Sequence, residues 1–280
     1  MLEKITVIGG DRRQTYLAQQ LLCSGFDVAI CGVPELSDTH ANLHDALCDA
    51  SAAALPMPAL EKDSLHIRAA QPFSLHSVLD AMRPGAYLFG GVLSPASALL
   101  AQYPSIRVMD YTASGALAAG NAVPTAEGAI QLAMEQLPIT LSQSRCLVIG
   151  FGRIGKVLAD RLRGLHAAVT VTARRTDDRA MIEAMGFAAD RTGLYLRGLG
   201  QYDCVFNTVP APVLKPEHLA AMQPNCLILD LATGGGLDAS CTVPVHPRYQ
   251  LASALPGRCS PAAAADVLRR YILDVFSAQP

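Results

Sequence analysis

Short apolar runs alternate with stretches of helical spacing along the first half of the chain. Each run suits a strand that is buried on both faces of a sheet. These predicted strands cover residues 5–8, 27–31, 52–56, 86–89 and 106–109. Helical spacing is found at residues 14–23, at 74–82 and in a segment that begins near Pro95. The alternation predicts a parallel, doubly wound sheet.

The same alternation returns after residue 145. Predicted strands cover residues 146–149, 168–173, 203–206, 226–230 and 249–252. Predicted helices cover residues 177–185, 216–222 and 261–276. A further helix is expected from Pro124 to about Leu137, because proline is favoured in the first turn of a helix.

The two alternations predict an α/β protein with two doubly wound parallel-sheet domains. Residues 1–120 are expected to form a flavodoxin-like or Rossmann-like domain, onto which a terminal helix at 260–280 packs back. Residues 121–259 are expected to form a Rossmann domain that includes the bridging helix 124–137. Ligands of such sheets bind outside the carboxyl ends of the strands, so we expect the active site in a cleft between the domains.

Composition excludes several classes of protein. Of the 280 residues, 51% are hydrophobic and only 16% are charged, which argues against disorder. The net charge of −2 and the lack of a basic stripe argue against nucleic acid as a partner. The longest apolar region, residues 85–101, is interrupted by Gly90-Gly91 and Ser94-Pro95, which disfavours a membrane span.

The eight cysteines include no C-x-x-C pair, which is typical of reduced thiols in a cytosolic protein. No group of histidines and cysteines has zinc spacing, so we expect no metal. No signal peptide is visible after Met1, and a cytoplasmic location is expected.

The strongest motif opens the second alternation. Residues 146–155 read C-L-V-I-G-F-G-R-I-G, a strand that runs into G-x-G-x-x-G and then into a helix. Its first glycine permits a tight turn, its second lets the backbone approach a pyrophosphate, and its third lets the helix pack close to the sheet. The helix N-terminus offers N–H groups to the phosphates. The residues expected to bind a dinucleotide are Gly150, Phe151, Gly152, Arg153, Ile154 and Gly155.

The end of the next strand indicates which dinucleotide is bound. NAD sites usually carry an acid there for the ribose 2′-hydroxyl, whereas NADP sites carry arginine for the 2′-phosphate. Here Ala173 is followed by Arg174 and Arg175, and the first acids are Asp177 and Asp178. Because a guanidinium presents a planar fork of donors to a phosphate, NADP is favoured over NAD.

Residues after two later strands are further candidates for the cofactor. The position after such a strand usually faces the nicotinamide part of the dinucleotide. The expected contacts are Asn207, Thr208, Val209, Pro210, Asp230 and Ala232.

Other polar residues lie where predicted elements meet. Arg12 and Arg13 follow a strand and open a helix, so an anion could use both a side chain and the helix dipole. Glu127 is a candidate base, although it could equally complement the N-terminus of its own helix. The remaining candidates at these ends are Asp11, Ser94, Asn121, Thr125 and Arg258.

Several motifs together resemble those of the family formed by the A subunits of dipicolinate synthase. They are V-I-G-G-D-x-R-Q at 7–14, N-x-V-P-T-x-E-G at 121–128, G-F-G-R-I-G at 150–155, A-R at 173–174 and N-T-x-P at 207–210. D-L-A at 230–232 and L-P-G at 255–257 continue the resemblance, which covers nearly the whole chain in order.

The resemblance implies an oxidoreductase of sporulating bacteria. It would convert dihydrodipicolinate, a product of the lysine and diaminopimelate branch, to dipicolinate with NADP as hydride acceptor. The flavoprotein-like B subunit of dipicolinate synthase would join it in an oligomer. The dianionic substrate would contact Asp11, Arg12, Arg13, Ser94, Asn121, Thr125 and Arg258, with Glu127 as base. The family often has Arg-Pro after D-L-A-S, whereas this chain has Thr233-Gly234, so Arg258 is expected to replace that arginine.

Two alternatives stay open. One is another two-domain dehydrogenase, of the 2-hydroxy-acid or alanine dehydrogenase type. Hydroxy-acid oxidation commonly uses histidine as the base, and residues 254–261, where it would be expected, contain none. The other is a nucleotide-binding regulatory protein that has no activity until a partner completes the site.

Overall fold

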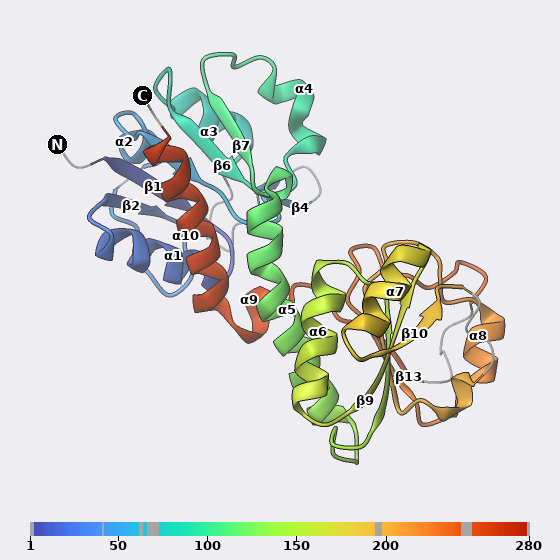
Figure 1. Cartoon of the computed structure of the whole chain (residues 1–280). Helices are drawn as coiled ribbons and strands as arrows, with labels where there is room; N and C mark the ends of the chain where they lie inside the picture. The colour runs from blue at the N-terminus through green and yellow to red at the C-terminus, as the bar shows by residue number, and fades with distance from the viewer. Residues whose placement is uncertain are drawn as a thin grey trace. The chain divides into compact units, whose positions relative to one another are not determined.

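The computed structural model describes residues 3–40, 42–61, 64–65, 73–193, 198–241 and 248–278. The chain forms two compact units, Met1–Gly120 together with Ser260–Pro280, and Asn121–Cys259. Each unit contains a parallel sheet with helices packed on it (Figure 1). The predicted fold class, α/β with two parallel sheets, is therefore confirmed.

The first unit is built on a five-stranded sheet in which every strand is parallel to its neighbours. The strand order is β2-β1-β3-β6-β7, the flavodoxin-like order of a doubly wound sheet. The strands are β1 (Lys4–Ile8), β2 (Asp27–Cys31), β3 (Ala52–Ala54), β6 (Tyr87–Gly90) and β7 (Arg107–Asp110). Along β1, Ile5 and Val7 belong to one buried core and Ile8 to another, so both faces of the sheet are covered.

Helices pack on the sheet and complete these two cores. They are α1 (Arg12–Cys23), α2 (Leu43–Leu47), α3 (Leu75–Ala81), α4 (Ser97–Leu100) and α10 (Pro261–Ser277), with 3₁₀ turns η1 (Ser94–Ala96) and η2 (Tyr111–Ala113) and a small ribbon of β4 (Leu60–Glu61) and β5 (Ser64–Leu65). Helix α10 packs against α1, where Leu268 and Ile272 share a core with Leu17 and Leu21. The last helix of the chain thus belongs to the first unit.

The second unit contains a six-stranded parallel sheet of order β10-β9-β8-β11-β12-β13. In chain order this is 3-2-1-4-5-6, the Rossmann arrangement. The strands are β8 (Arg145–Ile149), β9 (Ala168–Ala173), β10 (Ala188–Arg191), β11 (Cys204–Asn207), β12 (Leu227–Asp230) and β13 (Arg248–Leu251). The accompanying helices are α6 (Arg153–Gly164), α7 (Thr176–Ala184), α8 (Pro216–Ala221), α9 (Leu255–Cys259) and the 3₁₀ turn η3 (Leu199–Gln201).

Helix α5 (Gly115–Gln136) begins earlier than predicted, so the expected helix start at Pro124 is wrong. The Ser114 hydroxyl accepts the Leu117 N–H at 3.1 Å and caps the helix there. The alanine-rich segment that follows has high helix propensity. Pro124 consequently lies inside α5, where its missing N–H removes one backbone hydrogen bond.

Candidate functional site

The glycine motif joins β8 to α6 as the dinucleotide fingerprint requires. Gly150 has φ +103°, and a Cβ there would lie 2.5 Å from Thr208 Oγ1. A Cβ on Gly155 would lie 2.1 Å from the Gly150 carbonyl oxygen, so only glycine lets α6 approach the turn this closely. A Cβ on Gly152 would meet nothing within 4 Å. The backbone at Gly152 therefore borders open space, which a ligand can approach.

The N-terminus of α6 supplies hydrogen-bond donors at this loop. Its N-cap is Gly152, and no side chain in the described ranges caps it. The first N–H groups and the positive end of the helix dipole thus remain available to an anion. Phe151 and Ile154 are partly buried against the core, whereas Arg153 is exposed. The ammonium of Lys156 lies 4.8 Å from the Phe151 ring centre, which adds a second cation beside the loop.

Arg174 follows β9 directly, and its guanidinium pairs with no residue that the structure describes. Arg175 differs, because its Nη2 lies 3.3 Å from Asp177 Oδ2 on the exposed start of α7. Arg179, which the sequence analysis missed, donates from Nη1 to the Arg174 carbonyl at 2.9 Å and from Nη2 to the Thr176 hydroxyl at 3.1 Å. Arg179 therefore holds the turn, and Arg174 is left as the cation available to a phosphate.

The side chains of Asn207 and Asp230, two predicted cofactor contacts, are joined by a hydrogen bond. They are aligned partners at the ends of β11 and β12, and both are fully buried. Asn207 Nδ2 donates to Asp230 Oδ1 at 2.9 Å, and Asn207 Oδ1 accepts the Val209 N–H at 3.0 Å. Because burial removes both side chains from solvent, we interpret them as positioning residues for the segment Thr208–Pro210. Thr208 also donates its hydroxyl to the Ile149 carbonyl at 2.9 Å.

Asp230 also organises the loop after β12. Its Oδ1 accepts the Ala232 N–H at 3.2 Å, and its Oδ2 accepts the Gly236 N–H at 2.6 Å. Tyr249 of β13, which the sequence analysis missed, donates its hydroxyl to the same Oδ2 at 2.9 Å. Burial and then this hydrogen bond raise the pKa of Tyr249. The Asp230 side chain thus accepts four hydrogen bonds from described donors.

Replacing Asp230 with asparagine is expected to lower the free energy of unfolding by about 2 kcal/mol. An amide nitrogen in place of Oδ2 would face the Gly236 N–H and leave that donor without a partner. Urea denaturation followed by circular dichroism measures the change. The matched control is Asp238→Asn, because both hydrogen bonds from Ser240 go to Oδ1 of Asp238, which an asparagine retains. Equal losses in the two variants would contradict this role for Asp230.

Glu127, the candidate base, has a partner on the neighbouring helix. Arg161 Nε of α6 lies 3.1 Å from Glu127 Oε1, and the Glu127 side chain is 53% exposed. Because α5 begins at Gly115, Glu127 does not lie in the first turn of its helix, so the alternative role at the helix N-terminus is wrong. We interpret the ion pair as a link between α5 and α6.

Three predicted substrate contacts lie on α5 and α9. Thr125 is largely buried and donates its hydroxyl to the Asn121 carbonyl, one turn earlier, at 2.6 Å. Helix α9 packs on the same helix, since a Cβ on Gly128 would lie 3.1 Å from Cys259 Sγ. Arg258, the neighbour of Cys259, is exposed. The side chains of Asn121 and Arg258 form no hydrogen bond with any residue that the structure describes.

The remaining predicted substrate contacts belong to the first unit. Asp11 caps α1 by accepting the Arg13 N–H at 2.9 Å. Its carboxylate also binds the Arg13 guanidinium in a bidentate pair, with Nε–Oδ1 at 2.9 Å and Nη2–Oδ2 at 2.7 Å. Arg12 is more exposed, and its Nε lies 3.3 Å from Glu35 Oε1. The charge of Arg13 is thus neutralised locally, whereas Arg12 is the more accessible cation.

Ser94 is exposed at the start of η1, and the loop before it depends on Asp110 of β7, which the sequence analysis missed. Asp110 Oδ2 accepts the Leu93 N–H at 2.8 Å, and Oδ1 accepts the Val92 N–H at 3.2 Å. Burial alone would raise the pKa of Asp110, but hydrogen bonds from Thr112 and from these amides hold it below its ordinary value of 3.8. Asp110 therefore stays ionised and holds this loop.

Within the described ranges, no group of three or more histidine, cysteine, aspartate or glutamate residues could hold a metal ion. No helix in the part of the chain that the structure describes is long and apolar enough to cross a membrane.

Two protein families match successive parts of the chain. Residues 4–112 match the N-terminal domain of the dipicolinate synthase A subunit, and residues 123–267 match the NAD-binding domain of D-isomer specific 2-hydroxyacid dehydrogenases. The dipicolinate synthase A subunit of Bacillus subtilis strain 168 is 28% identical over 96% of this chain and 94% of its own length.

Solved structures agree with these matches. The crystal structure of the corresponding dipicolinate synthase chain from Bacillus subtilis has a TM-score of 0.86 at 27% identity, and covers 99% of this chain and 96% of its own. The A subunit from Bacillus halodurans has a TM-score of 0.87 at 23% identity, which shows the shared fold, with coverage of 99% and 98%.

The Rossmann sheet, the open glycine loop and the uncapped helix define a dinucleotide-dependent dehydrogenase-type protein. The chain belongs to the family of the D-isomer specific 2-hydroxyacid dehydrogenase NAD-binding domain, whose match spans more than half of it. Over its whole length it resembles the A subunit of dipicolinate synthase, as the sequence motifs predict.

Proposed function

We propose that this chain oxidises dihydrodipicolinate to dipicolinate, pyridine-2,6-dicarboxylate, and transfers the hydride to NADP. The observation that carries the proposal is the match of residues 4–112 to the N-terminal domain of the dipicolinate synthase A subunit. The NAD-binding domain of the second unit is common to dehydrogenases with many substrates. The first unit is what favours this substrate over the others.

The residues of the second unit fit a dinucleotide. The open space at Gly152 and the uncapped N-terminus of α6 suit a pyrophosphate. Arg174, which has no partner among the described residues, suits the 2′-phosphate that distinguishes NADP from NAD. When bound, the nicotinamide supplies the hydride acceptor. Thr208, Val209, Pro210 and Ala232 would line the rest of the cofactor site, on a loop network that Asn207 and Asp230 hold in place.

The substrate carries two carboxylates, so its binding requires cations or N–H donors. Arg12 and Arg258 are the exposed cations among the predicted contacts. Arg12 forms only a solvent-exposed ion pair with Glu35, whereas Arg13 is largely buried and paired with Asp11. Oxidation of the dihydropyridine-type ring removes a hydride and a proton and leaves an aromatic ring. Aromatisation supplies driving force, so orientation of the ring accounts for much of the catalysis. Because Glu127 is paired with Arg161, the proton passes to water.

The resemblance also supports two wider proposals. The flavoprotein-like B subunit of dipicolinate synthase would join this chain in an oligomer, because its relatives are named as one component of a larger synthase. The product would be made in the cytoplasm of a bacterium that forms spores.

The alternative is a 2-hydroxy-acid dehydrogenase, which the matched NAD-binding domain favours. Such an enzyme commonly uses histidine as its base. His218 is buried on α8, where its Nδ1 accepts the Lys215 N–H at 3.1 Å. Helix α9, which lies in the segment where such a histidine is expected, contains no histidine. The described site therefore supports the ring oxidation better.

The deciding experiment supplies freshly generated dihydrodipicolinate and NADP to the purified chain, with and without the flavoprotein-like partner, and follows NADPH absorbance. We expect NADPH to form in at least one of the two mixtures. Turnover by the chain alone would place hydride transfer in this chain, and turnover only with the partner would indicate a shared site. Binding of NADP without turnover in either mixture, together with oxidation of a 2-hydroxy acid, would overturn the proposal.

A further inference from the structure

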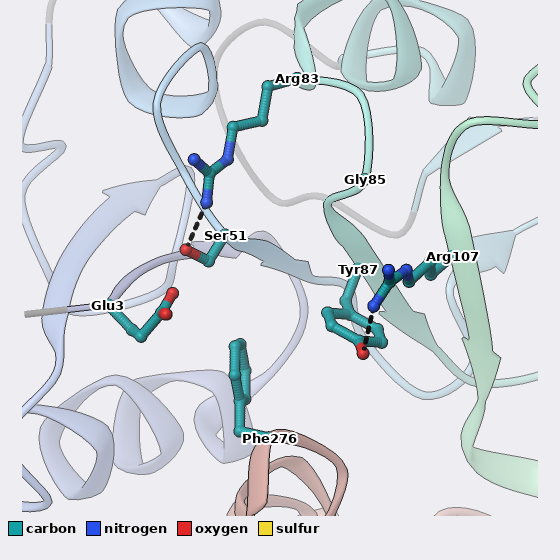
Figure 2. Close-up of a pocket in the computed structure, with 7 residues that line it drawn as sticks. All are labelled: Glu3, Ser51, Arg83, Gly85, Tyr87, Arg107 and Phe276. Carbon is teal, nitrogen blue, oxygen red and sulfur yellow. Dashed lines mark hydrogen bonds between the residues drawn. The ribbon is translucent and has the colours of Figure 1, made fainter. Parts of the chain in front are cut away.

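A cavity of about 160 Å³ lies in the first unit, and none of the predicted site residues lines it. Figure 2 shows its lining side chains, which come from the amino ends of several strands and from α10. The lining residues are Glu3, Ser51, Arg83, Gly85, Tyr87, Arg107 and Phe276. Arg107 opens β7 and Ser51 precedes β3, whereas the predicted substrate contacts of this unit follow carboxyl ends. The cavity and those contacts thus lie at opposite edges of one sheet.

Two arginines of this cavity are held in place by neutral partners. Arg83 donates from Nε to the Ala50 carbonyl at 3.0 Å and from Nη2 to the Ser51 hydroxyl at 2.7 Å. Arg107 donates from Nη1 to the Tyr87 hydroxyl at 2.9 Å, and its guanidinium carbon lies 5.2 Å from the Tyr87 ring centre. Neither guanidinium forms an ion pair with a carboxylate in the described part of the chain. Both keep their charge, and further N–H donors, for an anion.

The other walls restrict what kind of anion fits. The rings of Tyr87 and Phe276 lie with centroids 5.6 Å apart and inclined by 60°, so flat apolar surfaces flank the charged groups. The volume equals about five water molecules at ~30 Å³ each, enough for one small ring. Glu3 also lines the cavity (Figure 2), and its carboxylate would repel any anion that is not bound to an arginine.

We propose that this pocket binds a small planar dicarboxylate, with its carboxylates on Arg83 and Arg107 and its ring beside Tyr87 and Phe276. Its position at the sheet edge opposite the predicted substrate contacts of this unit makes it a second binding site, separate from those contacts. The choice of pyridine-2,6-dicarboxylate as its ligand rests on the proposed function, in which this molecule is the product.

Calorimetric titration of the full chain with pyridine-2,6-dicarboxylate tests the proposal. We expect Arg107→Gln to weaken binding at this pocket about tenfold, because a charged hydrogen-bond donor is lost. Glu3→Gln should tighten binding, because a repulsive charge is removed. The matched control is Arg145→Gln, since Arg145 opens β8 as Arg107 opens β7 and is likewise exposed. Circular dichroism melting confirms that each variant is folded.

Three outcomes separate the explanations. An affinity unchanged in Arg107→Gln, with all binding lost in Arg12→Ala or Arg258→Ala, would show that the ligand occupies only the candidate active site and would overturn the pocket. Inorganic phosphate that binds as tightly as the dicarboxylate, with the same dependence on Arg107, would overturn the ligand class. Binding that depends on Arg107 in a chain without turnover would support the pocket even though the proposed function had failed.

Discussion

Replacing Arg174 with alanine is expected to weaken NADP binding about 30-fold and to leave NAD binding nearly unchanged. Arg174 follows β9 where the ribose of a dinucleotide lies in Rossmann folds, and no described residue neutralises it. A guanidinium that binds a phosphate through charge-assisted hydrogen bonds contributes about 2 kcal/mol, which corresponds to this factor. Calorimetric titration of the purified chain with each cofactor measures both affinities.

Arg175→Ala is the matched control for this experiment. Arg175 is the next residue in the chain and equally cationic, but it is paired with Asp177. Its replacement should change the NADP affinity by less than threefold, about 0.6 kcal/mol, the scale of an exposed ion pair. Equal losses of NADP affinity in the two variants would indicate general attraction by a basic turn. A parallel loss of NAD affinity in Arg174→Ala would contradict a contact with the 2′-phosphate.

Gly155→Ala is expected to have the largest effect on the fold of the second unit. The new methyl group would lie 2.1 Å from the Gly150 carbonyl oxygen, which is backbone and cannot rotate away. Helix α6 must move off the turn, and we expect a loss of about 3 kcal/mol in the free energy of unfolding. Because the same movement displaces the N–H groups at the start of α6, dinucleotide binding should be lost as well. Urea denaturation and titration with NADP measure the two effects.

Two other glycines of the same region serve as controls. A Cβ would meet nothing within 4 Å at Gly152 or at Gly164, the last residue of α6. Gly164→Ala should leave both stability and cofactor affinity nearly unchanged. Gly152→Ala should leave stability unchanged but weaken NADP binding, because the methyl group projects where the pyrophosphate is expected. A stable Gly155→Ala variant with full affinity would contradict the close approach of α6.

Elements with strong local signals could be predicted from the sequence, and those defined by tertiary pairing could not. The turn at Gly150–Gly155 was predictable because glycine spacing encodes its backbone geometry. Strand β10 (Ala188–Arg191) has no apolar run, and its pairing with β9 is what makes it a strand. The start of α5 was missed because Pro124 is a strong signal for the first turn of a helix. The helix instead begins after Ser114, which caps it, and continues through the alanines that follow.

In the candidate site, too, positions along the strands could be predicted from the sequence, but contacts between strands or helices could not. The sequence places Asn207 and Asp230 at strand ends, but their mutual hydrogen bond depends on the register of β11 and β12. Likewise, the partner of Glu127 lies 34 residues away on another helix. Patterns along the chain identify which residues are polar at the correct sheet edge. They do not show which of these residues form hydrogen bonds or ion pairs with one another.

The first unit is assembled from two stretches of chain that are separated by the entire second unit. During synthesis, residues 121–259 are therefore complete before Pro261–Ser277 has left the ribosome. Until α10 emerges, Leu17 and Leu21 of α1 lack the apolar partners Leu268 and Ile272. Because domains fold as units during translation, the second unit can reach its native state while the first unit still lacks α10.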